Sequence, residues 1–233
     1  MQEQPAVQLA QELSSRLAPG DLDQTLRRIT QAAVEVLPGV DFASITVKHA
    51  DGRLETVAPT SDILLGLDAA QYELREGPCY DAAVEVAHRV SPDLANDERY
   101  ASYGPLAVAA GIAAQAGIRL FDTPLQAQGA LNLYSSSLGA FEDDGALAEL
   151  FRHQSATAIR YAGEIDDLRE AMTTRQLIGQ AVGIIMERYE LPDARAFAFL
   201  TRLSNERNVK LRLIAQELVA ASEHRHDDSP GWR

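Results

Sequence analysis

Residues that could act as acids, bases, nucleophiles or metal ligands are few in this sequence and do not cluster. Only two of the five histidines are close together, His224 and His226; the others are His49, His88 and His153. The single cysteine, Cys79, excludes an internal disulfide and a structural zinc site with several thiolates. No glycine-rich loop has the spacing of a phosphate- or dinucleotide-binding motif. We therefore expect a protein that is not an enzyme and that holds no metal and no resident cofactor.

Each remaining candidate has a simpler structural explanation. Cys79 and His88 could form a reactive pair, or His88 could ligate a haem, but closeness in sequence does not establish geometry. A lone cysteine is most often a small buried residue, and we expect this of Cys79. The acidic pairs Asp143-Asp144 and Asp166-Asp167 are typical of a helix surface rather than of a paired acid and base.

The composition is that of a globular protein without a membrane span. A chain of 233 residues predicts one large domain or two modest ones, and a hydrophobic content of 46% is ordinary. No run of about eighteen consecutive residues is apolar, as a transmembrane helix would require. The first residues, MQEQPAVQLAQELSSRL, have neither the basic start nor the apolar centre of a signal peptide. We therefore expect a cytoplasmic protein.

Charge is distributed unevenly along the chain. Residues 1–172 carry a net charge of −14, whereas residues 173–226 carry a net charge of +2. An acidic protein is an unfavourable starting point for binding nucleic acid, because affinity for nucleic acid comes largely from the neutralisation of phosphates. A locally positive segment is still compatible with such binding, with modest non-specific affinity.

The first 140 residues alternate between helical and strand patterns. Helices are expected over 6–37, with a break at Pro19-Gly20, and around Ile63–Tyr72. Asp41–Lys48 alternates like a half-buried strand, and Asp51-Gly52 is a strong hairpin signal before a return strand. The return strand is expected at Arg53–Ala58, and two further strands are expected at Ile112–Phe121 and Ala127–Tyr134.

The order of these elements resembles that of a GAF domain. The segment EGPCYDA at Glu76–Ala82, followed by a short strand at His88–Val90 and a turn at Ser91–Leu94, is similar to GAF domains that are fused to ANTAR domains in actinobacteria. The resemblance implies an antiparallel sheet backed by helices, often enclosing a pocket for a small molecule. A PAS-like fold is the alternative, because it also has an antiparallel sheet with helices on one side. The ligand is unknown: a small molecule, a redox change and no ligand at all are open.

A long helix is expected over 140–175. The acidic residues of Phe141–Asp144 favour the N-terminal end of its dipole. Apolar positions then repeat at spacings of three and four; the residues of this seam are Phe151, Gln154, Ala158, Tyr161, Ile165, Leu168 and Met172. One interpretation is a helix that packs on its own sheet and then on the C-terminal helices. The other is a parallel coiled coil over 151–172 that forms a homodimer and transmits a signal.

The last quarter of the chain divides into three short amphipathic segments, each with apolar residues three or four apart. These residues are Ile178, Val182 and Ile185 in the first, Ala196, Phe197, Leu200 and Leu203 in the second, and Leu211, Ile214, Ala215, Leu218 and Val219 in the third. Pro192 suits the first turn of the second helix, and Asn208 is expected to cap the start of the third. Three such helices form only a small bundle.

This segment resembles an ANTAR domain, a three-helix module that binds RNA as a transcription antiterminator. The resemblance depends on Arg175, Ile178, Gln180-Ala181, Gly183, Met186-Glu187-Arg188, Ala196-Phe197, Leu200, Ser204, Asn208, Lys210-Leu211-Arg212 and Ala215. Together the two resemblances imply an α+β protein of four parts. These are a GAF-like sensor domain over 1–140, a connecting helix over 141–172, an ANTAR domain over 173–222 and a polar, disordered tail over 223–233.

The ANTAR resemblance implies that the partner is RNA with two hexaloop stem-loops, whose stabilisation prevents a terminator from forming. Bases in such loops are unstacked and can be read on their edges. The residues expected to contact phosphates are Arg175, Arg188, Arg202, Lys210 and Arg212, and those expected to contact bases or sugars are Gln180, Ser204 and Asn208. Each has a local alternative: a helix cap for Asn208, a bond within its own helix for Ser204, and a solvated surface for the arginines.

Three residues depart from the family pattern. Val182 occupies a position where many members have lysine, and Phe199 and Thr201 occupy positions that are often basic. Fewer cations predict weaker and less salt-dependent binding. They also leave open a ligand- or partner-binding signalling protein whose ANTAR domain no longer binds RNA. A helix-turn-helix DNA-binding protein is less favoured, because no helix has the dense basic and polar face that a major groove requires.

Overall fold

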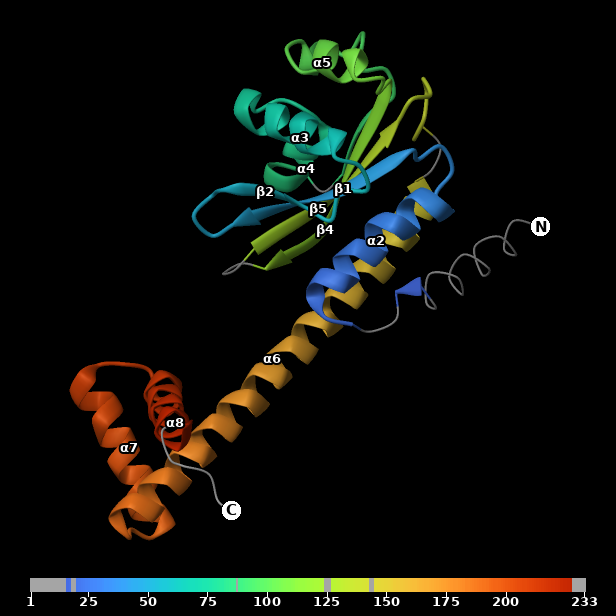
Figure 1. Ribbon diagram of the computed structural model, residues 1–233. Helices are drawn as coiled ribbons and strands as arrows, with labels where there is room; N and C mark the ends of the chain where they lie inside the picture. The colour runs from blue at the N-terminus through green and yellow to red at the C-terminus, as the bar shows by residue number, and fades with distance from the viewer. Residues whose placement is uncertain (1–15, 18–19, 87, 124–126, 143–144, 228–233) are drawn as a thin grey trace. The chain divides into compact units, whose positions relative to one another are not determined.

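A five-stranded antiparallel sheet forms the centre of the first part of the chain (Figure 1). The computed structural model describes residues 16–17, 20–86, 88–123, 127–142 and 145–227. The chain divides into two units, Met1–Ile165 and Asp166–Arg233. In the first unit the strands are β1 (Phe42–His49), β2 (Leu54–Val57), β3 (His88–Ser91), β4 (Ala114–Thr123) and β5 (Ala127–Ser135), in the order β2-β1-β5-β4-β3. The α+β fold class is confirmed.

Both hairpins that the sequence predicts are present. In the first, β1 pairs with β2 so that Ile45 faces Val57, and the amide of His49 donates to the carbonyl of Arg53. Gly52 lies in this turn with φ +85°, a left-handed conformation that glycine adopts without steric cost. The second hairpin pairs β4 with β5 along their whole length, with a register shift between Arg119 and Phe121.

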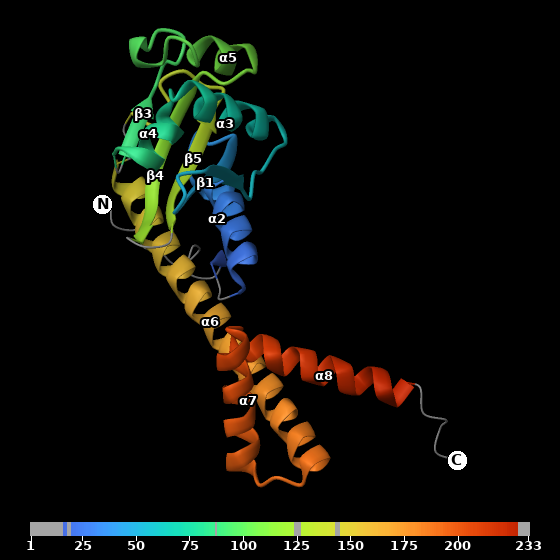
Figure 2. The same cartoon turned by 90° about the vertical axis from the view of Figure 1, so that its left-hand side faces the viewer.

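Helices cover both faces of the sheet, so the expectation of a half-buried first strand is wrong. On one face lie α2 (Leu22–Val36) and the first turns of α6 (Gly145–Tyr189), which bury Ile45 in the main apolar core. On the other lie α3 (Ile63–Leu74) and α4 (Pro78–Val84) (Figure 2). The Ser44 hydroxyl of β1 donates to Asp68 of α3 on this face. Ser44 and Thr46 are therefore fully buried, although alternation alone predicts that they face water.

A second apolar cluster lies on the α3 side of the sheet. It contains Leu64 and Leu67 of α3 together with Tyr100, Tyr103 and Tyr134, all buried. Tyr100 ends a short 3-10 helix, η1 (Glu98–Tyr100), and α5 (Gly104–Ala109) follows it. These short helices thus enclose the polar face of the sheet, where buried hydroxyl groups require hydrogen-bond partners.

The long helix α6 begins later than expected and ends later. Phe141 has φ +74°, a left-handed conformation that an α-helix does not include, so the helix cannot begin at Ala140. From Gly145 it continues without interruption to Tyr189, and the backbone between Phe151 and Met172 is helical throughout. Asp143 and Asp144, expected in its first turn, lie outside the described residues. The division between the units falls within this helix, after Ile165; the predicted domain boundaries stay predictions.

The second unit is a small helical bundle. The end of α6 packs against α7 (Asp193–Arg207) and α8 (Leu211–Asp227), so the first of the three expected helices is not a separate element. The buried residues of the bundle are Ala181, Val182, Ile185, Ala196, Leu200, Ile214 and Ala215. These belong to the three apolar faces that the sequence predicts, except that Ala181 and not Ile178 is fully buried on the first.

The caps and the end of this bundle differ from expectation. Asn208 adopts φ +51° as the C-cap of α7 and does not begin α8. Pro192 is the N-cap of α7 rather than a residue of its first turn. The sequence predicts a disordered tail from residue 223, but residues 223–227 are helical and belong to α8. Between residue 223 and Pro230 the sequence has no glycine or proline that would end the helix. Residues 228–233 lie outside the described residues. None of the described helices is long and apolar enough to cross a membrane.

Candidate functional site

The residues predicted to contact RNA all lie on the second unit, and most of them are exposed. Arg175, Gln180 and Arg188 are on α6, Arg202 and Ser204 are on α7, and Asn208, Lys210 and Arg212 are at or near the start of α8. Only Ser204 is partly buried. Arg175 and Gln180 are five residues apart, which places them about 140° apart around the helix axis, so α6 does not present them on one face.

Three of the predicted cations are exposed on the second unit. Within the part of the chain that the structure describes, the side chains of Arg175, Arg188 and Lys210 have no hydrogen-bond or ion-pair partner. Arg195, in the first turn of α7, is also exposed and without such a partner among the described side chains, and sequence reasoning missed it. A cation is unfavourable at the N-terminal end of a helix dipole, which could have singled out Arg195.

The other two predicted cations are already paired with acids. The Arg212 guanidinium lies 2.7 Å from a carboxylate oxygen of Glu170, which joins the start of α8 to α6. Arg202 lies 3.7 Å from Glu206 and its guanidinium carbon is 5.6 Å from the centre of the Phe199 ring. An ion pair of this kind cancels much of the attraction that the arginine exerts on a phosphate. The positive charge available to RNA is therefore smaller than the count of arginines indicates.

For two polar residues the structure favours the local role. The Ser204 hydroxyl donates to the carbonyl of Val209 at 2.6 Å, across the turn between α7 and α8. Asn208 holds the left-handed position of the same turn, and its backbone amide donates to the carbonyls of Ser204 and Asn205. The expectation that Asn208 caps α8 is therefore wrong, because its geometry ends one helix and does not begin the next.

The residues that depart from the family pattern have structural explanations. Val182 is buried in the core of the bundle, so valine at this position does not remove a cation from the surface of this chain. The Phe199 ring is partly buried and lies with its centre 5.6 Å from that of Tyr189. The Thr201 hydroxyl donates to the carbonyl of Phe197 at 3.0 Å, one turn earlier on α7.

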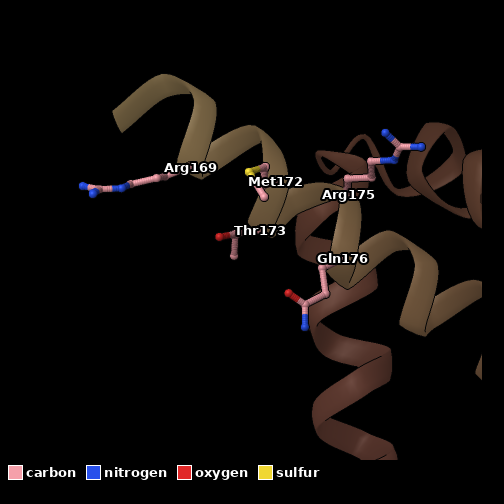
Figure 3. Close-up of a pocket in the computed structure, with 5 residues that line it drawn as sticks. All are labelled: Arg169, Met172, Thr173, Arg175 and Gln176. Atoms are coloured by element: carbon pink, nitrogen blue, oxygen red, sulfur yellow. The ribbon is translucent and has the colours of Figure 1, made fainter. Parts of the chain in front are cut away.

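A shallow pocket of about 550 Å³ lies along α6 beside Arg175 (Figure 3). Its lining residues are Arg169, Met172, Thr173, Arg175 and Gln176. Figure 3 shows that the two guanidinium groups point in different directions and that no polar groups converge on one point. Met172 is 73% exposed. The surface resembles an open helix face more than a binding cavity.

The first unit has a buried polar network that the sequence analysis did not find. Its centre is Asp68 of α3, a fully buried carboxylate that accepts hydrogen bonds from Ser44 at 2.8 Å, Thr56 at 3.0 Å and Tyr134. Burial raises the pKa of Asp68 to about 6, and the hydrogen bonds oppose this rise in part. The sequence feature that could have revealed this buried carboxylate is an acid on the apolar face of a helix, next to Leu64 and Leu67.

Cys79 is fully buried beside this network, which confirms the expectation of a core residue. Its sulfur accepts a hydrogen bond from the Gln115 amide at 2.6 Å, and its backbone amide donates to the side-chain oxygen of Gln71 at 3.1 Å. Gly77 allows this approach, because a Cβ there would lie 2.1 Å from the same Gln71 oxygen. Burial raises the pKa of the Cys79 thiol, which disfavours the nucleophilic thiolate.

The histidines and acids form no metal site in the described part of the chain. No group of three or more histidine, cysteine, aspartate or glutamate side chains has a suitable arrangement there. His88 is on the edge strand β3, and burial lowers its pKa. His49 is bonded to Glu55 at 2.7 Å across the first hairpin.

Comparison with family models identifies both units. The GAF domain model matches residues 20–160, and the ANTAR domain model matches residues 166–219. The GAF match covers more than half of the chain. It therefore favours the GAF fold over the PAS-like fold that the sequence left as an alternative.

Solved structures share the fold at low identity. The LuxR family transcription factor CepR2 from Burkholderia cenocepacia, described as N-acylhomoserine lactone dependent, is 11% identical with a TM-score of 0.51; the match covers 66% of this chain and 92% of that one. The phytochrome photosensory core module of Stigmatella aurantiaca is 15% identical with a TM-score of 0.54, covering 85% of this chain and 44% of that one. No curated protein matches. At these identities the likeness concerns the fold alone.

Proposed function

Because this chain belongs to the GAF family and carries an ANTAR domain behind its GAF domain, we propose that it is a transcription antiterminator that binds tandem hexaloop stem-loops in nascent RNA. ANTAR domains are RNA-binding antitermination modules, and GAF domains are sensor modules. In this proposal the GAF domain controls whether the ANTAR domain stabilises the stem-loops and so prevents a terminator from forming. Transcripts as targets place the protein in the cytoplasm.

The observation that carries the proposal is a set of exposed cations on the second unit. Arg175, Arg188, Arg195 and Lys210 are exposed, and none has a side-chain partner among the described residues. The chain as a whole has a net charge of −13, yet none of the acids in its described part pairs with these cations. Free cations of this kind suit phosphates, which supply most of the affinity for nucleic acid.

The division of roles follows from the chemistry of RNA loops. Phosphate contacts fix the position of a protein on the RNA, whereas contacts with base edges give sequence preference. Lys210 and Arg188 are suited to the first role and Gln180, an exposed amide, to the second. Ser204 and Asn208 are engaged in the turn between α7 and α8, so we assign them to the support of the surface.

The alternative is a signalling protein whose ANTAR domain does not bind RNA. Ion pairs favour this alternative, because Arg202, Arg207 and Arg212 are each within 4 Å of a glutamate. If these pairs persist in solution, three of the cations near α7 and α8 contribute little to phosphate binding. The two functions differ in whether hexaloop RNA is bound at all.

We also propose that the protein is not an enzyme. Cys79, the sole candidate nucleophile of its type, is buried with a raised pKa, and Asp68 is enclosed by hydroxyl groups away from solvent. The buried acid and thiol are thus suited to a packed network rather than to contact with a substrate.

A salt-dependent binding experiment tests the RNA proposal. The full chain is titrated with an RNA that has two hexaloop stem-loops and with an unrelated hairpin of equal length, each at several salt concentrations. The proposal predicts preferential binding of the hexaloop RNA and a decrease in affinity as salt rises. Equal affinity for the two RNAs at every salt concentration would reject it in favour of the signalling alternative.

A further inference from the structure

A surface pocket of about 280 Å³ lies in the first unit, where the β1–β2 hairpin meets the ends of α3 and α4. Two of its lining residues are cations, Lys48 at the end of β1 and Arg75 directly after α3. Tyr72 and Tyr80 supply aromatic walls, and none of the lining residues is acidic. The volume is close to the lower limit for pockets that hold small molecules.

The two cations lie in a domain that is strongly acidic. Neither side chain has a hydrogen bond or an ion pair with any residue that the structure describes. Lys48 is partly buried, so its side chain is held against the protein surface at the pocket. An anion in the pocket would supply the missing counter-charge to both residues.

Arg75 has an unusual backbone conformation at the edge of the pocket. Arg75 is the C-cap of α3 with φ +55°, a left-handed conformation in which glycine or asparagine is usually found. A long charged residue in this conformation is sterically disfavoured relative to glycine. The position places a guanidinium at the pocket, and a guanidinium fork matches the oxygens of a carboxylate or a phosphate.

One lining residue of the pocket, Tyr72, is joined to the buried network of Asp68. The Tyr72 hydroxyl lies 2.8 Å from that of Thr46 and 2.8 Å from that of Thr56. Thr56 in turn lies 3.0 Å from the Asp68 carboxylate. A molecule that displaces the Tyr72 ring would therefore change the hydrogen bonds around Asp68.

We propose that this pocket binds a small anionic ligand with a planar body, its carboxylate or phosphate between Lys48 and Arg75 and its ring against Tyr72 and Tyr80. In the proposed function, this ligand is the signal that the GAF domain senses. Only this regulatory role rests on the proposed function. Anion binding itself is a property of the first unit and does not require RNA.

The experiment titrates the full chain, labelled on its tyrosine rings, with phenyl phosphate, benzoate and neutral benzamide. Saturable shifts of the Tyr72 and Tyr80 signals, assigned with Tyr72→Phe and Tyr80→Phe, are expected with at least one of the anions and not with benzamide. Lys48→Gln and Arg75→Gln should each weaken binding about tenfold or more, as for loss of a charged hydrogen bond. Arg27→Gln is the matched control, because Arg27 is an exposed arginine of α2 outside the pocket, and it should have no effect.

The result has separate consequences for the two proposals. If neither anion shifts the two tyrosines, if benzamide binds as well, or if both substitutions leave the affinity unchanged, the pocket is not an anion site. A separate titration of the same preparation measures binding of hexaloop RNA. If the protein does not bind this RNA, the antiterminator proposal is rejected and the anion result is unaffected.

Discussion

At the scale of single residues, Asp68 makes stability depend on pH. Its pKa is raised from an ordinary value near 3.8 to about 6 in the folded chain, so the folded state holds its proton more tightly than the unfolded state. The free energy of unfolding therefore falls as pH rises from about 4 to about 6 and stays lower above that range. Between pH 5 and pH 7.5 the wild type should lose about 1–2 kcal/mol through this residue.

Asp68→Asn should remove this dependence. Urea unfolding of the two proteins at pH 5 and pH 7.5 measures the difference. Asp41, Glu76 and Asp97 have lowered pKa values and act in the opposite direction, but they are common to both proteins and cancel. The titratable groups that interact with Asp68 have raised pKa values and stay protonated in this range; they are Tyr72, Cys79, Tyr103 and Tyr134. A variant whose stability changes with pH as much as the wild type's would contradict the assignment.

Lys210 and Arg212 should differ in their effect on RNA binding, although they are two residues apart. Lys210 is unpartnered among the described residues, so Lys210→Ala should reduce the salt slope by about one ion. Arg212 is paired with Glu170, so Glu170→Ala should free a cation and strengthen binding, with a slope steeper by about one ion. Affinities across a salt series measure both. Glu206→Ala, which removes the partner of Arg202 on α7, is the matched comparison. If Lys210→Ala, Glu170→Ala and Glu206→Ala all leave the affinity unchanged, the RNA site lies elsewhere.

At the scale of the elements, the turn between α7 and α8 depends on the left-handed residue Asn208. Asn208→Gly should leave the melting temperature nearly unchanged, because glycine adopts this conformation without a Cβ clash. Asn208→Ala should destabilise the bundle by about 1–2 kcal/mol. Thermal unfolding of both variants measures this effect.

RNA binding by Asn208→Gly separates the structural role from a reading role. If the glycine variant keeps its stability and its preference for hexaloop RNA, Asn208 serves the turn alone. Loss of loop preference at unchanged stability would instead show that the amide contacts bases, contrary to our assignment.

At the scale of the whole molecule, the seam on α6 predicts a homodimer, but over a shorter stretch than the sequence indicates. Phe151 is buried in the core of the first unit and is not available to a second copy. Tyr161, Leu168 and Met172 are exposed by 48%, 65% and 73%. Exposed apolar residues in heptad spacing are typical of a helix that pairs with another helix.

Sedimentation equilibrium tests the dimer. The wild type should sediment as a dimer, and the double substitution Leu168→Glu/Met172→Glu as a monomer, because two charges in the seam are unfavourable. Leu138→Glu is the control, because Leu138 is 69% exposed and lies in the segment between β5 and α6, outside the seam. A wild type that is monomeric at all concentrations, or a double variant that stays dimeric, would reject pairing through this seam.

The local patterns of the sequence determined most elements of this protein. Alternation and the Asp51-Gly52 turn predicted the first hairpin, and apolar residues three or four apart predicted the faces of α6, α7 and α8 that pack together. Such features depend on neighbours within a few residues, so they can be read directly from the chain. The resemblance to two families, which the family models confirm, depended on the same local spacings.

Only the tertiary structure decided which residues of these patterns are available for binding. Ser44 is buried because helices α3 and α4, distant in sequence, cover the second face of its strand. Arg212 is neutralised by Glu170, forty-two positions earlier, and Lys48 meets Arg75 at one pocket because β1 and α3 end near each other. Burial and ion pairing are set by contacts between distant segments, which no local spacing specifies.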